Sequence, residues 1–388
     1  MTKPCVGPAL SASCDPCEHV PDYIRAIAPY QPGKPVSELA REYGLEEASI
    51  IKLASNENPL GLPPAARAAI ERELHELARY PDGNQYDLKV AISQRTSWPI
   101  EGIVVGNGSN DLLEMAAAAL LAPGRACVFS QHAFAVYPLA TQARGAQSIM
   151  VPARDYAHDM PAMARAVTET TRLMFVANPN NPTGTFAPQG QIETLLNSVP
   201  RSVLVVLDEA YNEYLPSECR YDATRWLPEH PNLMIVRTFS KVYGLAGLRV
   251  GYALMHPAMA DMLNRVRQPF NVNNLALVAA KAALGDERFV ERSFALNREG
   301  MAQLESGFRK LSLEWIPSFA NFVSVRIPRR EGKPQAMVVF EQLLRRGVIV
   351  RPVGGYQMPD HLRITIGLPQ ENERFLIALR DSLQETHA

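Results

Sequence analysis

The sequence predicts an α/β fold in which a large, doubly wound and mostly parallel sheet is joined by a smaller α+β domain. Short β-branched runs alternate with helical stretches through the middle of the chain. Near-continuous apolar strands separated by helices are typical of a parallel sheet covered on both faces. After Pro269 the pattern changes, because a long charged helical stretch precedes three short strands. With 388 residues, 47% of them hydrophobic, the chain is long enough to bury such a core.

The expected elements of the larger domain follow one another in order. IVVGNG (103–108) leads into DLLEMAAAALLA (111–122), a run of strong helix formers. The further expected strands are ACVFS (126–130), QSIMVP (147–152), RLMFVANP (172–179), SVLVVLDEA (202–210), NLMIVRTFS (232–240) and RVGYALM (249–255).

The smaller domain is expected from the rest of the chain. A helical stretch at about 274–313 precedes three short strands, FVSVRI (322–327), VIVRPV (348–353) and LRITIG (362–367). The segment before residue 60 is short and interrupted by prolines, so it joins this unit or crosses the larger one. We therefore predict a disordered tail at 1–20, a large domain at 61–269, and a small domain formed by 21–60 with 270–388.

Composition excludes several classes of function. Lys and Arg number 39 against 40 Asp and Glu, so no electrostatic reason favours nucleic acid or a membrane surface as a partner. No apolar run reaches the roughly 18 residues of a membrane span, and the N-terminus lacks the apolar region of a secretory signal. Cys14 and Cys17 form a CxxC without a second ligand pair. We expect a cytoplasmic protein without a metal.

Polar residues follow several predicted strands at the point where the chain leaves the sheet. Ligands of open parallel sheets bind beyond the carboxyl ends of the strands. A purely structural sheet would not need an acid, two amides and a lysine at one rim. The residues concerned are Gly108, Ser109 and Asn110, the segment from Asn178 to Gly184, Asp208 and Tyr211, and Thr238, Ser240 and Lys241.

These side chains match the needs of pyridoxal phosphate chemistry. A lysine must hold the cofactor aldehyde as a Schiff base, and a carboxylate must keep the pyridine nitrogen protonated. The phosphate needs a helix N-terminus and an arginine, and an aromatic face fixes the ring. Lys241, Asp208 and Arg249 are the candidates. Each also has an ordinary interpretation, as a solvated lysine, a helix cap or metal ligand, and a surface ion pair.

Two loops complete this set of candidates. NPNNPTG (178–184) specifies a rigid, non-helical turn, and by itself it is no more than a turn. GNGSND (106–111) supplies backbone amides at the start of a helix, where an anion binds readily. A nicotinamide-binding loop is the rival interpretation, but GNGSND lacks the GxGxxG spacing.

Several of these motifs resemble one known family. SKVYGLAGLRVG (240–251) is similar to the lysine signature of the fold-type I, class I/II aminotransferases, and NPNNPTG and DEAY (208–211) match two further motifs in the same order. The resemblance runs from about Tyr30 to the C-terminus and implies a fold-type I pyridoxal phosphate transferase. Within the family, the histidinol-phosphate branch is the one most resembled. The motifs that carry this are APYQPGKP, KLASNENPLG, RYPDG, SQHAFAVYPLAT, ANFV and LRITIG.

The resemblance assigns roles at the cofactor. It makes Lys241 the Schiff-base lysine that also moves the proton between substrate and cofactor carbons. Asp208 pairs with the pyridinium nitrogen, Asn181 and Tyr211 bond the phenolic oxygen, and Phe134 stacks on the ring. The residues that the resemblance places at the cofactor phosphate are Ser109, Asn110, Thr238, Ser240 and Arg249, with Tyr80 contributed by a second subunit. A homodimer with a shared active site is therefore expected.

The resemblance also suggests how substrates bind. Arg363 matches the arginine that grips an anionic group, and a guanidinium suits a carboxylate or a phosphate alike. Arg351 matches a second arginine near this anion, Tyr30 matches a tyrosine that closes over the substrate, and Asn181 also lies at this side. A strand-edge charge and a packed aromatic are the ordinary interpretations of Arg351 and Tyr30.

The implied reaction interconverts L-histidinol phosphate and 2-oxoglutarate with imidazole-acetol phosphate and L-glutamate, a step of histidine biosynthesis. An aromatic amino-acid aminotransferase is the alternative, since flat rings fit similar pockets. A phosphothreonine decarboxylase type of lyase is a rival from another enzyme class. A binding protein without activity is disfavoured, because Lys241, Asp208 and Arg249 are all present.

Overall fold

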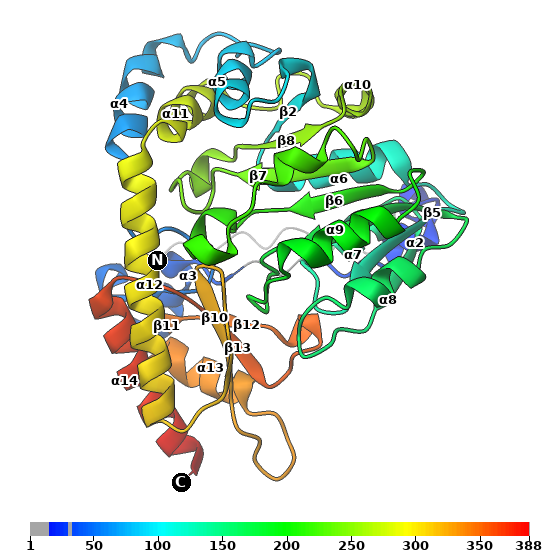
Figure 1. The fold of residues 1–388 in the computed structure, drawn as a ribbon. Coiled ribbons are helices and arrows are strands. Elements are labelled where there is room, and N and C mark those ends of the chain that lie inside the picture. Colours follow the sequence, from blue (N-terminus) through cyan, green and yellow to red (C-terminus); the bar gives the residue numbers. More distant parts are fainter. Residues whose placement is uncertain (1–14, 30–32, 388) are drawn as a thin grey trace.

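A computed structural model describes residues 15–29 and 33–387 of the chain, and it has the expected α/β architecture. A seven-stranded sheet forms the centre of the larger part, with helices on both faces (Figure 1). A second, antiparallel sheet lies in the smaller part below it in the same view. The predicted fold class is confirmed.

All the strands predicted for the large sheet are present. β8 is antiparallel to both of its neighbours and the other pairs are parallel, so the sheet is mostly parallel as predicted. In spatial order the strands are β2 (Ile103–Gly106), β8 (Gly251–Met255), β7 (Leu233–Thr238), β6 (Leu204–Asp208), β5 (Thr171–Ala177), β3 (Ala126–Ser130) and β4 (Gln147–Val151).

Alternating side chains of the central strands supply two separate cores. In β2, Ile103 and Val105 pack into one core and Val104 into the other, because successive side chains of a strand point to opposite faces. Helices of the first core are α4 (Pro64–Glu73), α5 (Tyr86–Thr96), α8 (Met160–Arg165), α9 (Gln189–Ser198) and α11 (Asn274–Leu284). Helices of the second core are α6 (Ser109–Leu120), α7 (Val136–Ala143) and α10 (Pro257–Val266).

The smaller part contains the three strand runs predicted near the C-terminus. Val350 separates two strands within the predicted run 348–353, of which β11 (Val348–Ile349) pairs in parallel with β1 (Ile51–Lys52). The four-stranded antiparallel sheet has the order β12 (Arg351–Pro352), β13 (His361–Thr365), β10 (Phe322–Arg326) and β9 (Trp315–Ile316). The helices α13 (Ala336–Arg345) and α14 (Pro369–His387) pack against it through a third core.

The predicted helical stretch 274–313 is two helices. α11 is capped by Asn273, and α12 (Glu287–Lys310) is capped by Asp286, whose Oδ1 accepts a hydrogen bond from the backbone N–H of Phe289. α11 packs against α4 and α5 of the larger part. α12 runs from there into the smaller part, where it packs against α14 (Figure 1). The division of domains at residue 269 remains a prediction.

The N-terminal segment contributes short helices. Residues 1–14, which make up most of the predicted tail and include Cys14, lie outside the described residues. The helices of this segment are α1 (Asp15–Glu18), α2 (Asp22–Arg25) and α3 (Val36–Tyr43). None of the helices within the described ranges combines the length and the apolar character that a membrane span requires.

Candidate active site

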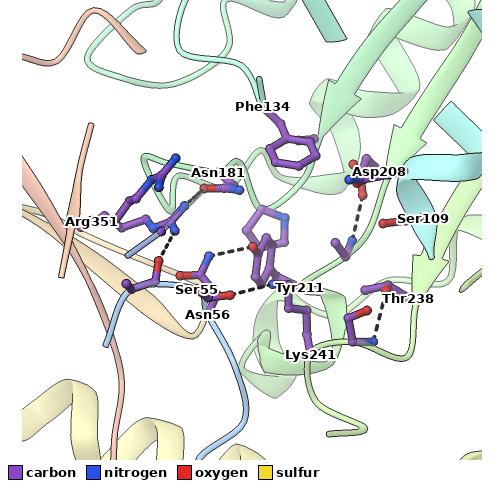
Figure 2. Close-up of a pocket in the computed structure, with 18 of the residues that line it drawn as sticks. Ser55, Asn56, Ser109, Phe134, Asn181, Asp208, Tyr211, Thr238, Lys241 and Arg351 are labelled. Carbon is purple, nitrogen blue, oxygen red and sulfur yellow. Dashed lines mark hydrogen bonds between the residues drawn. The ribbon is translucent and has the colours of Figure 1, made fainter. Parts of the chain in front are cut away.

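One pocket lies where the carboxyl ends of β5, β6 and β7 meet the N-terminus of α6. The segment 54–56 and residues of the second sheet close its other side. The position beyond the strand ends is the one expected for a ligand site in such a sheet. Figure 2 shows the side chains that converge on this pocket from both parts of the molecule.

Lys241 follows β7, in a stretch of the chain where Phe239 and Val242 are fully buried. Its Nζ donates a 3.2 Å hydrogen bond to the backbone carbonyl of Ser55 and lies 5.6 Å from the ring centroid of Tyr211. Burial, followed by the positive charge of Arg363, lowers the pKa of Lys241 to about 7. A large fraction of this amine is therefore neutral, and so nucleophilic, near neutral pH.

Asp208 is the last residue of β6 and only 5% of its surface is exposed. Its Oδ2 accepts a 2.8 Å hydrogen bond from the Tyr137 hydroxyl, and its Oδ1 accepts one of 3.2 Å from the backbone N–H of Ala210. Burial raises its pKa to about 6. Within the described ranges, Asp208 forms no ion pair with a lysine, arginine or histidine. A buried carboxylate with only neutral donors suits a cationic group of a ligand.

Tyr211 and Asn181 lie on the side of the pocket that faces the second sheet. The Tyr211 hydroxyl accepts a 2.8 Å hydrogen bond from Asn56 Nδ2, and burial raises its pKa to about 12. Asn181 belongs to the turn predicted for NPNNPTG, and that turn is confirmed. Its Oδ1 accepts a hydrogen bond from Arg363 Nη1. The Arg363 guanidinium also donates to the carbonyl of Ala54 at 2.8 Å, which fixes its plane toward the pocket.

The N-terminus of α6 and Arg249 form a cradle for an anion. The residue before the helix, Gly108, has φ +83°, and a Cβ atom there would lie 2.5 Å from Arg249 Nη2. Arg249 Nη1 donates to Ser240 Oγ at 3.4 Å and to the carbonyl of Ala246 at 3.2 Å. Both acceptors are neutral, so the arginine charge adds to the positive end of the helix dipole. Such a site suits a phosphate group.

Phe134 supplies an aromatic face to the pocket (Figure 2). Its ring meets Tyr137 edge-on, with 5.9 Å between the ring centroids. Tyr137 in turn stacks on Phe175 of β5 with a centroid distance of 4.4 Å. A flat ligand ring placed against Phe134 would therefore lie on a rigid aromatic support.

The pocket brings together twelve of the residues predicted for the site. They are Ser109, Asn110, Phe134, Asn181, Asp208, Tyr211, Thr238, Ser240, Lys241, Arg249, Arg351 and Arg363. Tyr80 does not reach the pocket of its own chain, since it is 82% exposed and stacks on Phe270 at 4.8 Å. Tyr30 lies outside the described residues. The individual roles remain predictions.

Among the lining residues with polar side chains, sequence reasoning missed Ser55, Asn56, Tyr137 and Tyr356. Asn56 and Tyr137 lie within motifs that were noted for their resemblance, KLASNENPLG and SQHAFAVYPLAT. The available signal for Asn56 is an amide within a segment interrupted by prolines. Nothing in the sequence indicates that Tyr137, on a helix that covers the sheet, has a hydroxyl directed to the end of β6.

Comparisons with known proteins agree with this geometry. The family model "Aminotransferase class I and II" matches residues 48–379. The chain is 56% identical to histidinol-phosphate aminotransferase 2 of Nitrosospira multiformis, over 95% of this chain and 93% of that protein. It is 57% identical to the histidinol-phosphate aminotransferase of Methylobacillus flagellatus, over 95% of this chain and 98% of that protein.

A solved structure has the same overall fold. The histidinol-phosphate aminotransferase of Sinorhizobium meliloti, crystallised with pyridoxal-5'-phosphate, superposes with a TM-score of 0.88 at 26% sequence identity. The match covers 97% of this chain and all of that chain. The likeness therefore includes both sheets.

Proposed function

The chain belongs to the class I and II aminotransferase family, and we propose that it interconverts L-histidinol phosphate and 2-oxoglutarate with imidazole-acetol phosphate and L-glutamate. This reaction is a step of histidine biosynthesis. Its relatives at 54–57% identity are histidinol-phosphate aminotransferases. The observation that carries the proposal is one pocket that holds a lysine of lowered pKa, a buried carboxylate and two arginines, Arg249 and Arg363.

Pyridoxal phosphate is the cofactor, and the donor set of the pocket fits it. When bound, it supplies an aldehyde that takes up the amino group and a ring that withdraws electrons from the reacting carbon. Lys241 Nζ would attach it and would move a proton at the substrate carbon. Asp208 would accept a hydrogen bond from the protonated ring nitrogen and so keep that nitrogen charged. Tyr211 and Asn181 would bond the phenolic oxygen.

The remaining cofactor contacts follow from the anion cradle. Arg249 and the first amides of α6 would bind the phosphate, helped by the hydroxyl groups near them. Ser240 N donates to Thr238 Oγ1 at 3.1 Å, which fixes the conformation of this turn. Phe134 would stack on the ring. The hydroxyl and amide residues at the phosphate are Ser109, Asn110, Thr238 and Ser240.

The second guanidinium would bind the anionic end of either substrate. Arg363 is buried and directed by Asn181 and Ala54, and Arg351 lines the same wall. L-Glutamate presents carboxylates, whereas L-histidinol phosphate presents a phosphate, and a guanidinium binds both. Tyr30 is proposed to cover the substrate. Because both half-reactions use one pocket, ping-pong kinetics follow.

A homodimer with shared sites is part of the proposal. Tyr80 is exposed, and so are apolar side chains close to it in the sequence, Leu74 at 52%, Leu77 at 51% and Tyr86 at 60%. An apolar surface of this kind is typical of a protein contact. We assign it to a second copy, whose Tyr80 would reach the cofactor phosphate. Cys17, Cys127 and Cys219 are free thiols, which suits the proposed cytoplasmic location.

The test is a stopped-flow experiment on the cofactor-loaded protein. L-Histidinol phosphate, L-phenylalanine and L-phosphothreonine are mixed with it separately, and the loss of the cofactor absorbance band is recorded. Fast conversion by L-histidinol phosphate and slow conversion by the others supports the proposal. Faster conversion by L-phenylalanine would reassign the enzyme to aromatic amino acids, and carbon dioxide release from L-phosphothreonine would make it a lyase.

A further inference from the structure

Tyr137 is a buried tyrosine of α7 whose ring is held on two sides. It has no exposed surface, and its ring lies parallel to that of Phe175, with 4.4 Å between centroids and an interplanar angle of 6°. The ring of Phe134 meets the same ring at an interplanar angle of 88°, with 5.9 Å between centroids. Packing of this kind leaves the hydroxyl group little freedom of direction.

The hydroxyl is directed at the carboxylate of Asp208. Tyr137 Oη lies 2.8 Å from Asp208 Oδ2, and the other carboxylate oxygen accepts from the backbone N–H of Ala210 at 3.2 Å. An ionised carboxylate only accepts hydrogen bonds, so the tyrosine is the donor. Each oxygen is thus held by one protein donor, and the plane of the carboxylate is fixed.

The groups around Asp208 act in opposite directions on its ionisation. Burial and the neighbouring Glu209 raise its pKa, whereas Lys241 lowers it. The hydrogen bonds from Tyr137 and Ala210 also lower it, and that from Tyr137 is the largest of the lowering effects. The other titratable groups that act on Tyr137 are Tyr211 and the buried thiol of Cys127. Tyr137 is the group that can be tested most directly. Its side chain contacts the Asp208 carboxylate, and phenylalanine replaces it with almost the same shape.

We propose that Tyr137 is a positioning residue that keeps the Asp208 carboxylate ionised and oriented toward the ring nitrogen of the bound cofactor. The inference rests on the proposed function, because it assumes a ligand with a protonated ring nitrogen. Through its contact with Phe134, the same side chain supports the aromatic face of the pocket. The hydroxyl of Tyr137 is engaged by Asp208, so Tyr137 acts on the cofactor through that carboxylate.

The test uses the apo-protein and pyridoxamine 5′-phosphate. This ligand has the ring nitrogen and the phosphate but no aldehyde, so its affinity does not depend on attachment to Lys241. Affinity is measured by calorimetry between pH 6 and pH 9 for the native protein and Tyr137→Phe. The matched control is Tyr214→Phe, which removes the hydroxyl of another buried tyrosine, one that does not line this pocket.

Loss of the donor raises the pKa of Asp208, so a larger fraction of the carboxylate is protonated at neutral pH. We expect Tyr137→Phe to bind about tenfold more weakly than native protein at pH 7, as for a lost hydrogen bond to a charged group. The difference should shrink toward pH 9, where the carboxylate is ionised in both proteins. Tyr214→Phe should match the native protein throughout.

Two results overturn the inference. Equal affinity of Tyr137→Phe and native protein at every pH removes the role of the hydroxyl, and an equal loss at every pH reduces it to packing. The Asp208→Asn background is a further control. No carboxylate is left there to titrate, so we expect the effect of Tyr137→Phe on affinity to be the same at every pH. If the native apo-protein itself fails to bind pyridoxamine phosphate, the proposed function fails as well, and that outcome is distinct from both.

A second variant covers the case in which Tyr137→Phe does not fold. Incorporation of 3-fluorotyrosine at position 137 preserves the ring packing and makes the hydroxyl a stronger donor. The pH below which affinity falls should then move downward, opposite to the shift in Tyr137→Phe. An unchanged or upward shift would contradict the inference.

Discussion

Asn56 Nδ2 donates a 2.8 Å hydrogen bond to the hydroxyl of Tyr211, which joins the N-terminal segment to the loop that follows β6. The backbone of Asn56 is left-handed, with φ +56°, and its N–H donates a 2.9 Å hydrogen bond to Thr365 Oγ1. These two features fix the position from which the side chain reaches Tyr211. The side chain that sets Tyr211 is therefore fixed by β13 of the second sheet.

Replacement of Asn56 should impair catalysis more than folding. Asn56→Gly removes the donor and keeps the left-handed backbone, whereas Asn56→Ala removes the donor and adds strain of about 1 kcal/mol. We expect both to lower kcat about tenfold, through loss of the hydrogen bond that orients Tyr211. Thermal unfolding should separate them, with the alanine variant less stable. A normal kcat in Asn56→Gly would show that Tyr211 needs no such support.

Attachment of pyridoxal phosphate to the apo-protein should depend on pH through Lys241. Burial and Arg363 lower the pKa of this amine to about 7, and only the neutral amine attacks an aldehyde. The rate should therefore rise with pH up to about 7 and level off above it, as measured by stopped-flow absorbance. Arg363→Leu should move the rise to higher pH, whereas the exposed Arg326→Leu should not. A rate that still climbs between pH 9 and pH 10 would contradict the lowered pKa.

Gly108→Ala should weaken cofactor binding specifically. The new Cβ would displace the guanidinium of Arg249 from the anion cradle, since it would lie 2.5 Å from Nη2. Gly124→Ala is the matched control, because Gly124 has φ +86° and no heavy atom within 4 Å of the added Cβ. Both variants should lose about 1–2 kcal/mol of stability through the left-handed backbone. Only Gly108→Ala should bind pyridoxamine phosphate more weakly, and equal affinities would argue against the cradle.

Arg363→Lys should lower kcat/KM for L-glutamate by about 10- to 100-fold, because an ammonium group replaces the planar fork that binds an anion through two donors. Arg326→Lys on the neighbouring strand β10 is the control, since its ion pair with Glu314 is on the surface. Initial rates with L-glutamate and with L-histidinol phosphate give the comparison. Native kinetics of Arg363→Lys with both substrates would remove this arginine from the site.

Two inactive variants should restore activity when they form mixed dimers. Lys241→Ala lacks the attachment point, and Tyr80→Ala lacks the side chain that the proposal places in the site of the partner. A mixed dimer has one site with both residues, so co-expressed variants should give about a quarter of native activity. Each variant expressed alone is the control. If the activity of the co-expressed variants does not exceed the summed activities of the two variants expressed alone, Tyr80 does not belong to a shared site.

Most of the fold could be predicted because buried parallel strands have a strong local signature. The run from Leu204 to Asp208 is entirely buried, and its apolar sequence alone indicates a central strand. The break at Val350 could not be predicted, since VIVRPV is uniformly apolar up to Arg351 and strand pairing changes within it. β11 pairs with β1, which is distant in the sequence, whereas β12 pairs with β13. The local sequence therefore does not indicate where the pairing changes.

The candidate site divides in the same way. Lys241, Asp208 and Arg249 could be found because each follows a predictable strand or lies near a glycine-rich turn. Tyr137 and Asn56 could not be assigned, because their importance comes from distant partners. Asp208 is 71 positions from Tyr137, and Tyr211 is 155 positions from Asn56. A hydrogen bond between such positions exists only after the chain has folded.

The long helix α12 has a consequence for how the molecule unfolds. At its start Ser293 accepts a 2.8 Å hydrogen bond from Asn58 Nδ2, which also donates to the carbonyl of Val242 in the large part. Further along, Met301, Leu304 and Phe308 belong to the core of the smaller part. Neither part can unfold without disrupting the helix that also contacts the other part. Heating should therefore produce one cooperative transition, in which the calorimetric enthalpy equals the van't Hoff enthalpy.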